Sequence, residues 1–253
     1  MATTPRRLAR QLAAVEAAIA DPASDVEDLA EEGHLQQLIY QRLVASPELI
    51  RPVLNSVPRR FRRAVRANLR AGLALGRLSA SPPKQLPPWR IVAPPRAEKL
   101  RRYYARAARA SNVRWAYLAA IHLVETRMSR IVGDSTAGAQ GPMQFIPETW
   151  ARFGRGDVRD TRPAIMAAAR YLAASGAPRD MAAALYSYNN STHYVEAVQA
   201  YARHMLEDPL AFRGYYHWQV YYARPAGPLW LREGYDRISA LPSATPQSNS
   251  AGA

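Results

Sequence analysis

The chain has 253 residues, of which 48% are hydrophobic, so it can bury a substantial core as one large domain or two small ones. It contains no cysteine, which excludes a disulfide framework and thiol chemistry. The formal net charge is +14 and the sequence pI is about 10.5. This balance favours anionic partners such as nucleic acid, acidic lipid or an anionic wall polymer.

The first 78 residues form a basic region in which the apolar pattern predicts helices over residues 5–20, about 26–46 and 59–78. No Asp or Glu occurs between Glu48 and Glu98. The third helix is therefore either a docking surface for an anionic polymer or an ordinary solvated helix face. Nucleic acid is not expected as its partner, because no nucleic-acid-binding motif accompanies the charge. The arginines of this helix are Arg59, Arg60, Arg62, Arg63, Arg66, Arg70 and Arg77.

No segment predicts a signal peptide. The first 20 residues form an amphipathic pattern that contains Arg10 and Glu16, whereas an export signal needs an unbroken apolar run. The apolar run 113–124 is far shorter than the roughly 20 residues that cross a bilayer, so no transmembrane segment is expected.

Changes in composition divide the chain. Residues 79–95 contain six prolines and predict an extended linker. We expect a basic helical region at 1–78, this linker at 79–95, a helical domain at 96–206, an aromatic extension at 207–236 and a disordered tail at 237–253. Within the extension, residues 215–235 alternate with a period of two and predict a small β-hairpin, whose Tyr and Trp side chains are expected to pack against one another.

The stretch Trp115–Trp150 carries the clearest functional signal. Its first part is apolar on nearly all sides and predicts a buried helix that ends near Glu125. Trp115, His122 and Glu125 share one face of that helix. A carboxylate beside buried neighbours loses hydration, which raises its pKa and lets it donate a proton near neutral pH. The alternative is that Glu125 only ends the helix and pairs with a nearby arginine, Arg127 or Arg130.

A loop rich in glycine follows the helix, from Ser135 to Pro147. Its two glycines and its prolines predict tight turns, where backbone can approach a ligand closely. Met143 can anchor the loop to a core, and Gln144 offers an amide donor and acceptor next to it.

Three sequence motifs in a fixed order resemble the catalytic core of the lytic murein transglycosylases, enzymes of the lysozyme superfamily that cleave the peptidoglycan glycan strand. The resemblance covers about residues 97–206, with a looser similarity at 212–235. Its motifs are Glu125-Thr126; Ser135-x-x-Gly138-Ala139-x-Gly141-x-Met143-Gln144 followed by Pro147-x-Thr149-Trp150; and Ala184-Leu185-Tyr186-Ser187-Tyr188-Asn189-Asn190-Ser191 followed by Tyr194-Val195.

The resemblance implies a mainly α, lysozyme-like α+β fold, with a helical catalytic domain, a helical N-terminal region and a small C-terminal β-hairpin. It implies cleavage between N-acetylmuramic acid and N-acetylglucosamine with Glu125 as the one catalytic acid and base, which leaves 1,6-anhydromuramyl ends. It also implies an extracytoplasmic location and no cofactor, and no metal-ligand spacing is present. The residues implied to bind substrate are Ser135, Met143, Gln144, Tyr188 and Asn189.

Two alternatives stay open. If a second carboxylate reaches the cleft, a hydrolytic muramidase on the same fold is expected. The basic charge also suits a non-catalytic protein that binds the cell wall or another polyanion. The candidates for the second carboxylate are Asp134, Glu148, Asp157 and Asp160, which are otherwise expected to be helix caps and loop ligands.

Overall fold

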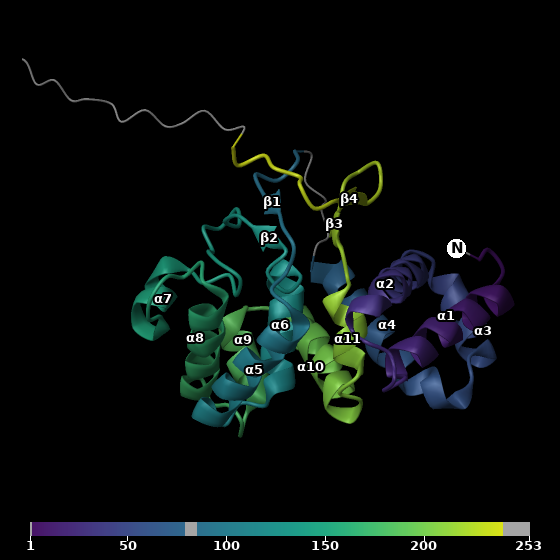
Figure 1. Ribbon diagram of the computed structural model, residues 1–253, viewed down its shortest axis with the longest axis horizontal. Helices are drawn as coiled ribbons and strands as arrows, with labels where there is room; N and C mark the ends of the chain where they lie inside the picture. The colour runs from purple at the N-terminus through teal and green to yellow at the C-terminus, as the bar shows by residue number, and fades with distance from the viewer. Residues whose placement is uncertain (1, 79–84, 240–253) are drawn as a thin grey trace, which may run out of the picture.

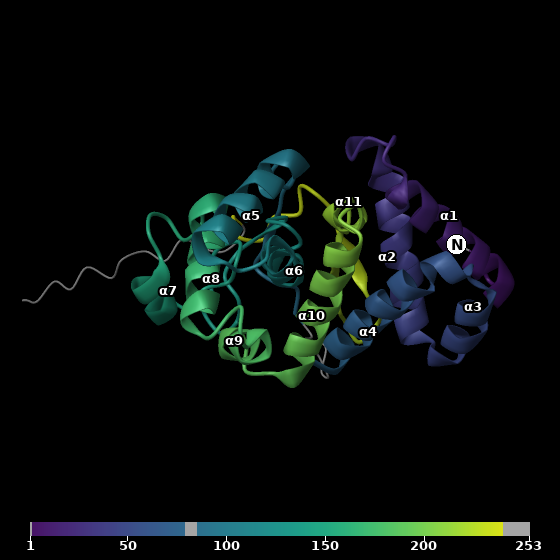
Figure 2. The same ribbon diagram turned by 90° about the horizontal axis from the view of Figure 1, so that it is seen from below.

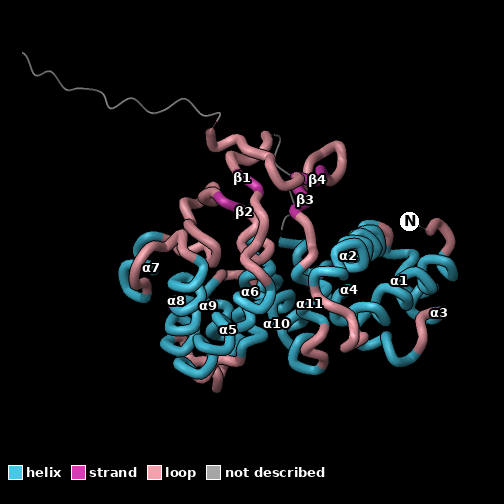
Figure 3. Tube along the Cα trace, viewed as in Figure 1, coloured by secondary structure: helices cyan, strands magenta, loops and turns pink. Residues whose placement is uncertain are grey.

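The structure is a computed structural model that describes residues 2–78 and 85–239. It confirms the mainly α prediction, with two short antiparallel sheets beside the helices (Figure 3). The N-terminal part contains α1 (Pro5–Ala20), α2 (Ala30–Ala45), α3 (Ile50–Ser56) and α4 (Arg62–Leu78), with 3-10 turns at Glu27–Leu29, Pro47–Leu49 and Arg59–Phe61. The later helices are α5 (Ala97–Ser111), α6 (Trp115–Thr126), α7 (Pro147–Phe153), α8 (Thr161–Ala174), α9 (Met181–Tyr188), α10 (Thr192–Glu207) and α11 (Ala211–Tyr216). The strands are β1 (Arg90–Ile91), β2 (Ile131–Val132), β3 (Val220–Tyr222) and β4 (Leu229–Leu231).

Helices α1 to α4 lie at one end of the molecule and α7 to α9 at the other, with α6 and α10 between them (Figures 1 and 2). Helix α4 packs along α10, and one hydrophobic core runs from Leu8 in α1 to Leu185 in α9. The division of the chain into domains remains a prediction, since this core is continuous across it. No helix in residues 2–78 and 85–239 combines the length and apolar character that crossing a membrane requires.

The two sheets lie together above the helices and enclose the end of α6 (Figure 1). Strand β1 pairs with β2, with Ile91 opposite Ile131, so part of the segment expected to be a linker is a strand. Residues 79–84 of that segment lie outside the described residues. In the tail expected to be disordered, Arg237 donates its amide to the Trp89 carbonyl (3.0 Å), and residues 240–253 lie outside the described part.

The aromatic extension forms its hairpin later in the chain than its alternating pattern predicts. Strand β3 pairs with β4, but Tyr215 and Tyr216 belong to helix α11. The reason is tertiary, because the buried Tyr215 hydroxyl donates to Asn68 Oδ1 of α4 (2.7 Å) and hydrogen-bonds His204 Nδ1 of α10 (2.8 Å). A strand would turn alternate side chains away from this core.

A buried carboxyl joins the N-terminal helices to the extension. Glu16 of α1 is 4% exposed and accepts hydrogen bonds from the Tyr40 hydroxyl and from Gln36 Nε2 (3.1 Å). Gln36 in turn accepts from the indole N–H of Trp218 (3.0 Å). Burial raises the pKa of Glu16 to about 7, although the two hydrogen bonds act in the opposite direction.

Glu16 makes stability fall with rising pH. The folded chain keeps this proton up to about pH 7, whereas a carboxyl in the unfolded chain loses it near 4.5, so the free energy of unfolding declines across that window. At about 1.4 kcal/mol per pKa unit, the decline is about 3 kcal/mol. Glu16→Gln is expected to flatten it in urea unfolding measured from pH 4.5 to 8. The exposed Glu31→Gln is the control, and an unchanged slope in Glu16→Gln would contradict the assignment.

Candidate active site

Helix α6 ends in a way that places Glu125 at a cavity. Arg127, Met128 and Ser129 all adopt left-handed backbone conformations, with φ of 52°, 61° and 71°. Such residues are strained unless their surroundings hold them. The Arg127 amide caps the helix on the carbonyls of His122 and Leu123, so the chain turns away directly after Glu125.

Buried polar side chains hold this turn. His122 is fully buried and hydrogen-bonds the Tyr104 hydroxyl and Ser129 Oγ, each at 2.7 Å. Burial lowers the pKa of His122 to about 3, so its ring is neutral near pH 7. Thr126 Oγ1 donates to the Pro142 carbonyl (2.6 Å) and accepts from the Ser129 amide (3.2 Å). The helix end and the glycine loop are therefore fixed to each other.

Glu125 lines a cavity of about 680 Å³. Val124 at the end of α6 and Arg127 directly after the helix also line it. Residues 85–89, the loop residues 134–136 and strand β3 with Ala223 form its walls. The cavity is thus built from segments that are far apart in the sequence, and it is lined by residues of both small sheets, Ile131 of β2 and Val220–Tyr222 of β3.

The carboxyl of Glu125 is held by one tyrosine. The hydroxyl of Tyr194, at the start of α10, donates to Glu125 Oε1 (2.6 Å). Burial raises the pKa of Glu125 to about 7, and the hydrogen bond from Tyr194 acts in the opposite direction. Within the described residues Glu125 forms no ion pair, because Arg127 donates to the Leu123 carbonyl and Arg130 to the Tyr216 carbonyl. A carboxyl with these properties can release and recover a proton near neutral pH.

The third motif meets the second through a hydrogen bond. Tyr188, the last residue of α9, donates its hydroxyl to the Met143 carbonyl (2.7 Å) and stacks on Tyr194, with ring centroids 6.4 Å apart. Burial, and then the charge of Glu125, raises the pKa of Tyr188 well above its usual value. Asn189 follows Tyr188 and is half-buried, and its side chain has no hydrogen-bond partner among the described residues.

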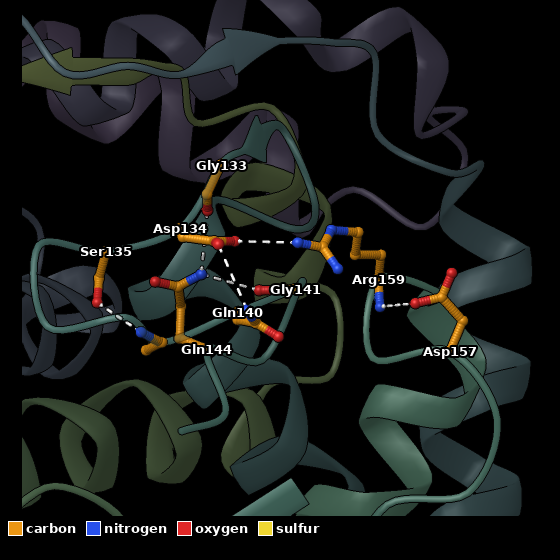
Figure 4. Close-up of polar contacts among 9 residues, drawn as sticks. Gly133, Asp134, Ser135, Gln140, Gly141, Gln144, Asp157 and Arg159 are labelled. Atoms are coloured by element: carbon orange, nitrogen blue, oxygen red, sulfur yellow. Dashed lines mark hydrogen bonds and ion pairs between the residues drawn. The ribbon is translucent and has the colours of Figure 1, made fainter. Parts of the chain in front are cut away.

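The loop residues predicted to bind substrate have different environments. Gln144 has a left-handed backbone, with φ of 51°, and its side-chain N–H donates to the Gly141 carbonyl (2.9 Å). Ser135 Oγ accepts from the Ala139 amide (3.0 Å), so it braces the loop where it lines the cavity (Figure 4). Met143 is fully buried and presents its carbonyl to Tyr188, so its side chain adds no surface to the cleft.

Glu125 and Ser135 are the predicted site residues that line the 680 Å³ cavity. Gln144, Tyr188 and Asn189 do not line it, although the contacts above tie them to the same helix end and loop. Their roles toward a substrate remain predictions.

Of the four other acidic candidates, Asp134 reaches the cavity that contains Glu125. Its side chain is 3.6 Å from the guanidinium of Arg159 (Figure 4). Asp157 accepts from the Arg159 amide (2.8 Å), and Asp160 precedes α8 as its N-terminal cap residue. Glu148 is exposed in the first turn of α7. Asp134 is therefore the one of these four that can take part in chemistry beside Glu125.

Sequence patterns missed Tyr194 as a site residue. The motif that includes Tyr188 and Asn189 also contains Tyr194, but the apolar side of α10 accounts for a tyrosine there without any polar role. Nothing in the sequence shows that its hydroxyl points at Glu125 of another helix.

Tyr194→Phe is expected to raise the pKa of Glu125 further, because it removes a hydrogen bond that favours the ionised carboxyl. If Glu125 must be protonated to act, the alkaline limb of the pH–rate profile for kcat/KM shifts to higher pH. Tyr201→Phe, which alters another buried tyrosine of α10, is the control. A profile that does not move in Tyr194→Phe would show that the hydrogen bond has no influence on the working acid.

Comparison with known proteins gives two matches. Residues 102–210 match the family described as the transglycosylase SLT domain. The chain is also 29% identical over 152 residues to the membrane-bound lytic murein transglycosylase F of Thiobacillus denitrificans (strain ATCC 25259 / T1). This alignment covers 57% of the chain and 32% of the relative, so the chain spans about a third of the length of that protein. No solved structure matches.

Proposed function

Because residues 102–210 match the family described as the transglycosylase SLT domain, we propose that the chain is a peptidoglycan lytic transglycosylase, a carbohydrate lyase with Glu125 as its single catalytic acid and base. The observation that carries this proposal is the Glu125 carboxyl. It lines a cavity, accepts a hydrogen bond from Tyr194, and has a pKa raised to about 7. The substrate places the activity outside the cytoplasm.

The proposed reaction begins with protonated Glu125. It donates its proton to the oxygen that links N-acetylmuramic acid to N-acetylglucosamine, and the glycosidic bond breaks. The carbonyl of the muramyl N-acetyl group attacks the anomeric carbon in place of a second carboxylate. Glu125, now ionised, takes the proton of the C6 hydroxyl; that oxygen attacks the anomeric carbon, the bond from this carbon to the N-acetyl oxygen breaks, and the 1,6-anhydro ring closes. Water does not enter the product.

The environment of Glu125 suits both halves of this reaction. Burial favours the neutral acid before bond cleavage, and the Tyr194 hydroxyl stabilises the carboxylate after it. Tyr188 and Asn189 are proposed to hold the N-acetyl group, and Gln144 and Ser135 to position the sugar. Met143 is proposed to support substrate binding through the backbone that it anchors.

Mass spectrometry of cleaved muropeptides tests this function. The expected product has anhydromuramyl ends. A hydrolytic muramidase would give a product heavier by one water, and that second candidate is supported by the position of Asp134 in the same cavity as Glu125. Binding of cell walls without any cleavage would favour the non-catalytic alternative.

The basic helix α4 remains a proposed docking surface for anionic wall polymers. Two of its arginines are engaged by acidic residues of α10, since Arg63 pairs with Glu207 (2.5 Å) and Arg70 pairs with Glu196 (2.7 Å). Arg66 of α4 and Arg59 of the 3-10 turn before it are exposed and are available to a polyanion.

A further inference from the structure

A row of cavities leads away from Glu125. The cavity that contains Glu125 shares Ile131 and Asp134 with a second cavity of about 520 Å³. This second cavity shares Pro95 and Thr161 with a third, of about 580 Å³, between α5 and α8. Because neighbouring cavities share wall residues, the three lie next to one another on the molecule.

The third cavity is strongly cationic. Four basic side chains line it, and Asp160 is the one acidic residue that does so. These cations form no ion pair within residues 2–78 and 85–239, and residues 1, 79–84 and 240–253 contain no Asp or Glu. The cavity therefore concentrates positive charge that the chain itself does not neutralise. The basic side chains are Lys99 of α5, Arg155 after α7, and Arg162 and Arg170 of α8.

One of these cations is held in position. Arg170 donates from Nε (2.9 Å) and Nη2 (2.6 Å) to the Phe153 carbonyl at the end of α7. Its Nη1 has no hydrogen-bond partner among the described residues and is free for a ligand. Burial, and then the charge of Arg155, lowers the pKa of Arg170. Bringing cations together costs free energy that a bound anion would recover.

The second cavity, which lies between the Glu125 cavity and the third cavity, is also basic. Arg90 and Arg159 line the second cavity, and Asp134 offsets one of them through its contact with Arg159 (Figure 4). The chain thus offers an anionic ligand increasing positive charge as it extends from Glu125 toward α8.

We propose that the cationic cavity between α5 and α8 binds the carboxylates of the short peptides carried by the glycan strand. This inference rests on the proposed function, because it takes the strand to be bound at Glu125. The sugar rings of the strand are neutral and suit the more apolar cavity beside Glu125, whereas the peptides bear free carboxylates. Guanidinium groups bind carboxylates through paired, charge-assisted hydrogen bonds. The site would make this chain prefer strands that retain their peptides.

The test measures binding without cleavage. In the Glu125→Gln background, Kd is measured for soluble glycan strands with their peptides and for strands from which an amidase has removed the peptides. The double variant Arg155→Gln/Arg162→Gln removes two exposed cations of the cavity and leaves Arg170 on the Phe153 carbonyl. The matched control is Arg106→Gln/Arg109→Gln, which removes the same charge from the exposed face of α5.

The parent protein is expected to bind peptide-bearing strands about tenfold more tightly than stripped strands at low salt, and the double variant of the cavity is expected to lose this preference. The control variant keeps it, and added salt weakens it. Equal binding of both strands by the parent protein would overturn the proposal, as would equal effects of the two double variants.

A poly(glycerol phosphate) chain is the second probe. If the cavity variant loses binding to this polymer and not to peptide-bearing strands, the cavity takes phosphates and the proposal is wrong. These outcomes do not depend on cleavage, so they stay separate from a failure of the proposed activity, which the product spectrum reports.

Discussion

Glu125→Gln is expected to lower the rate of glycan cleavage by at least about 10³-fold, because one carboxyl is proposed to be both the acid and the base of the reaction. Gln is close in shape to Glu and can still accept the Tyr194 hydrogen bond, but it cannot donate a proton to the glycosidic oxygen. The measurement is the release of soluble muropeptides from purified peptidoglycan. Retained activity in Glu125→Gln would remove this residue from the mechanism.

Asp134→Asn is the matched comparison, because Asp134 is the other acidic residue that lines the same cavity. In a single-acid mechanism its loss is expected to cost little, since it removes only an exposed contact with Arg159. A loss as large as that of Glu125→Gln would instead indicate two catalytic carboxylates, and therefore a hydrolytic muramidase.

Gly141→Ala is expected to destabilise the chain by about 3 kcal/mol or more, because its added methyl group has no space. A Cβ at this position would lie 2.0 Å from the Val158 carbonyl oxygen, and the backbone has a φ of +71° that disfavours a side chain. The backbones of Gly141 and Val158 cannot move apart without displacing the loop that carries Gln144. For a chain of this length the melting temperature is expected to fall by about 6–12 °C in a thermal scan.

Gly138→Ala separates the effect of the steric clash from the effect of the left-handed backbone conformation. Gly138 has a similar backbone conformation, with a φ of +78°, but an added Cβ would meet no atom within 4 Å. Its substitution is expected to cost only the conformational strain of about 1–2 kcal/mol. If both variants are equally unstable, the close approach of Gly141 to Val158 does not decide the stability of the loop.

The sequence predicted the local structure well where local patterns control it. The apolar run after Val113 is buried and helical because it has no polar face. Charged residues follow this run in the sequence, and the first of them, Glu125, lies in the last turn of the helix. The order of the motifs predicted a resemblance to the lytic transglycosylases, and residues 102–210 match the transglycosylase SLT domain. The hairpin was predicted too early in the chain, because alternation at Tyr215 resembles a strand until Asn68 and His204 are seen to bind its hydroxyl.

Several features depend on contacts between distant segments and are absent from any local pattern. The pairing of β1 with β2 brings residues 85–89 to the Glu125 cavity, although proline content alone indicated a linker. The Tyr194 hydroxyl meets Glu125 across 69 positions of sequence.

By itself, the sequence determined the composition of the chain, its helices, the order of its motifs and its candidate acid. Only the tertiary structure decided which groups surround that acid, that its pKa is raised, and that unpaired cations gather between α5 and α8. The physical reason is that helical periodicity is set by residues three and four positions apart, whereas desolvation and charge depend on every atom that packs nearby.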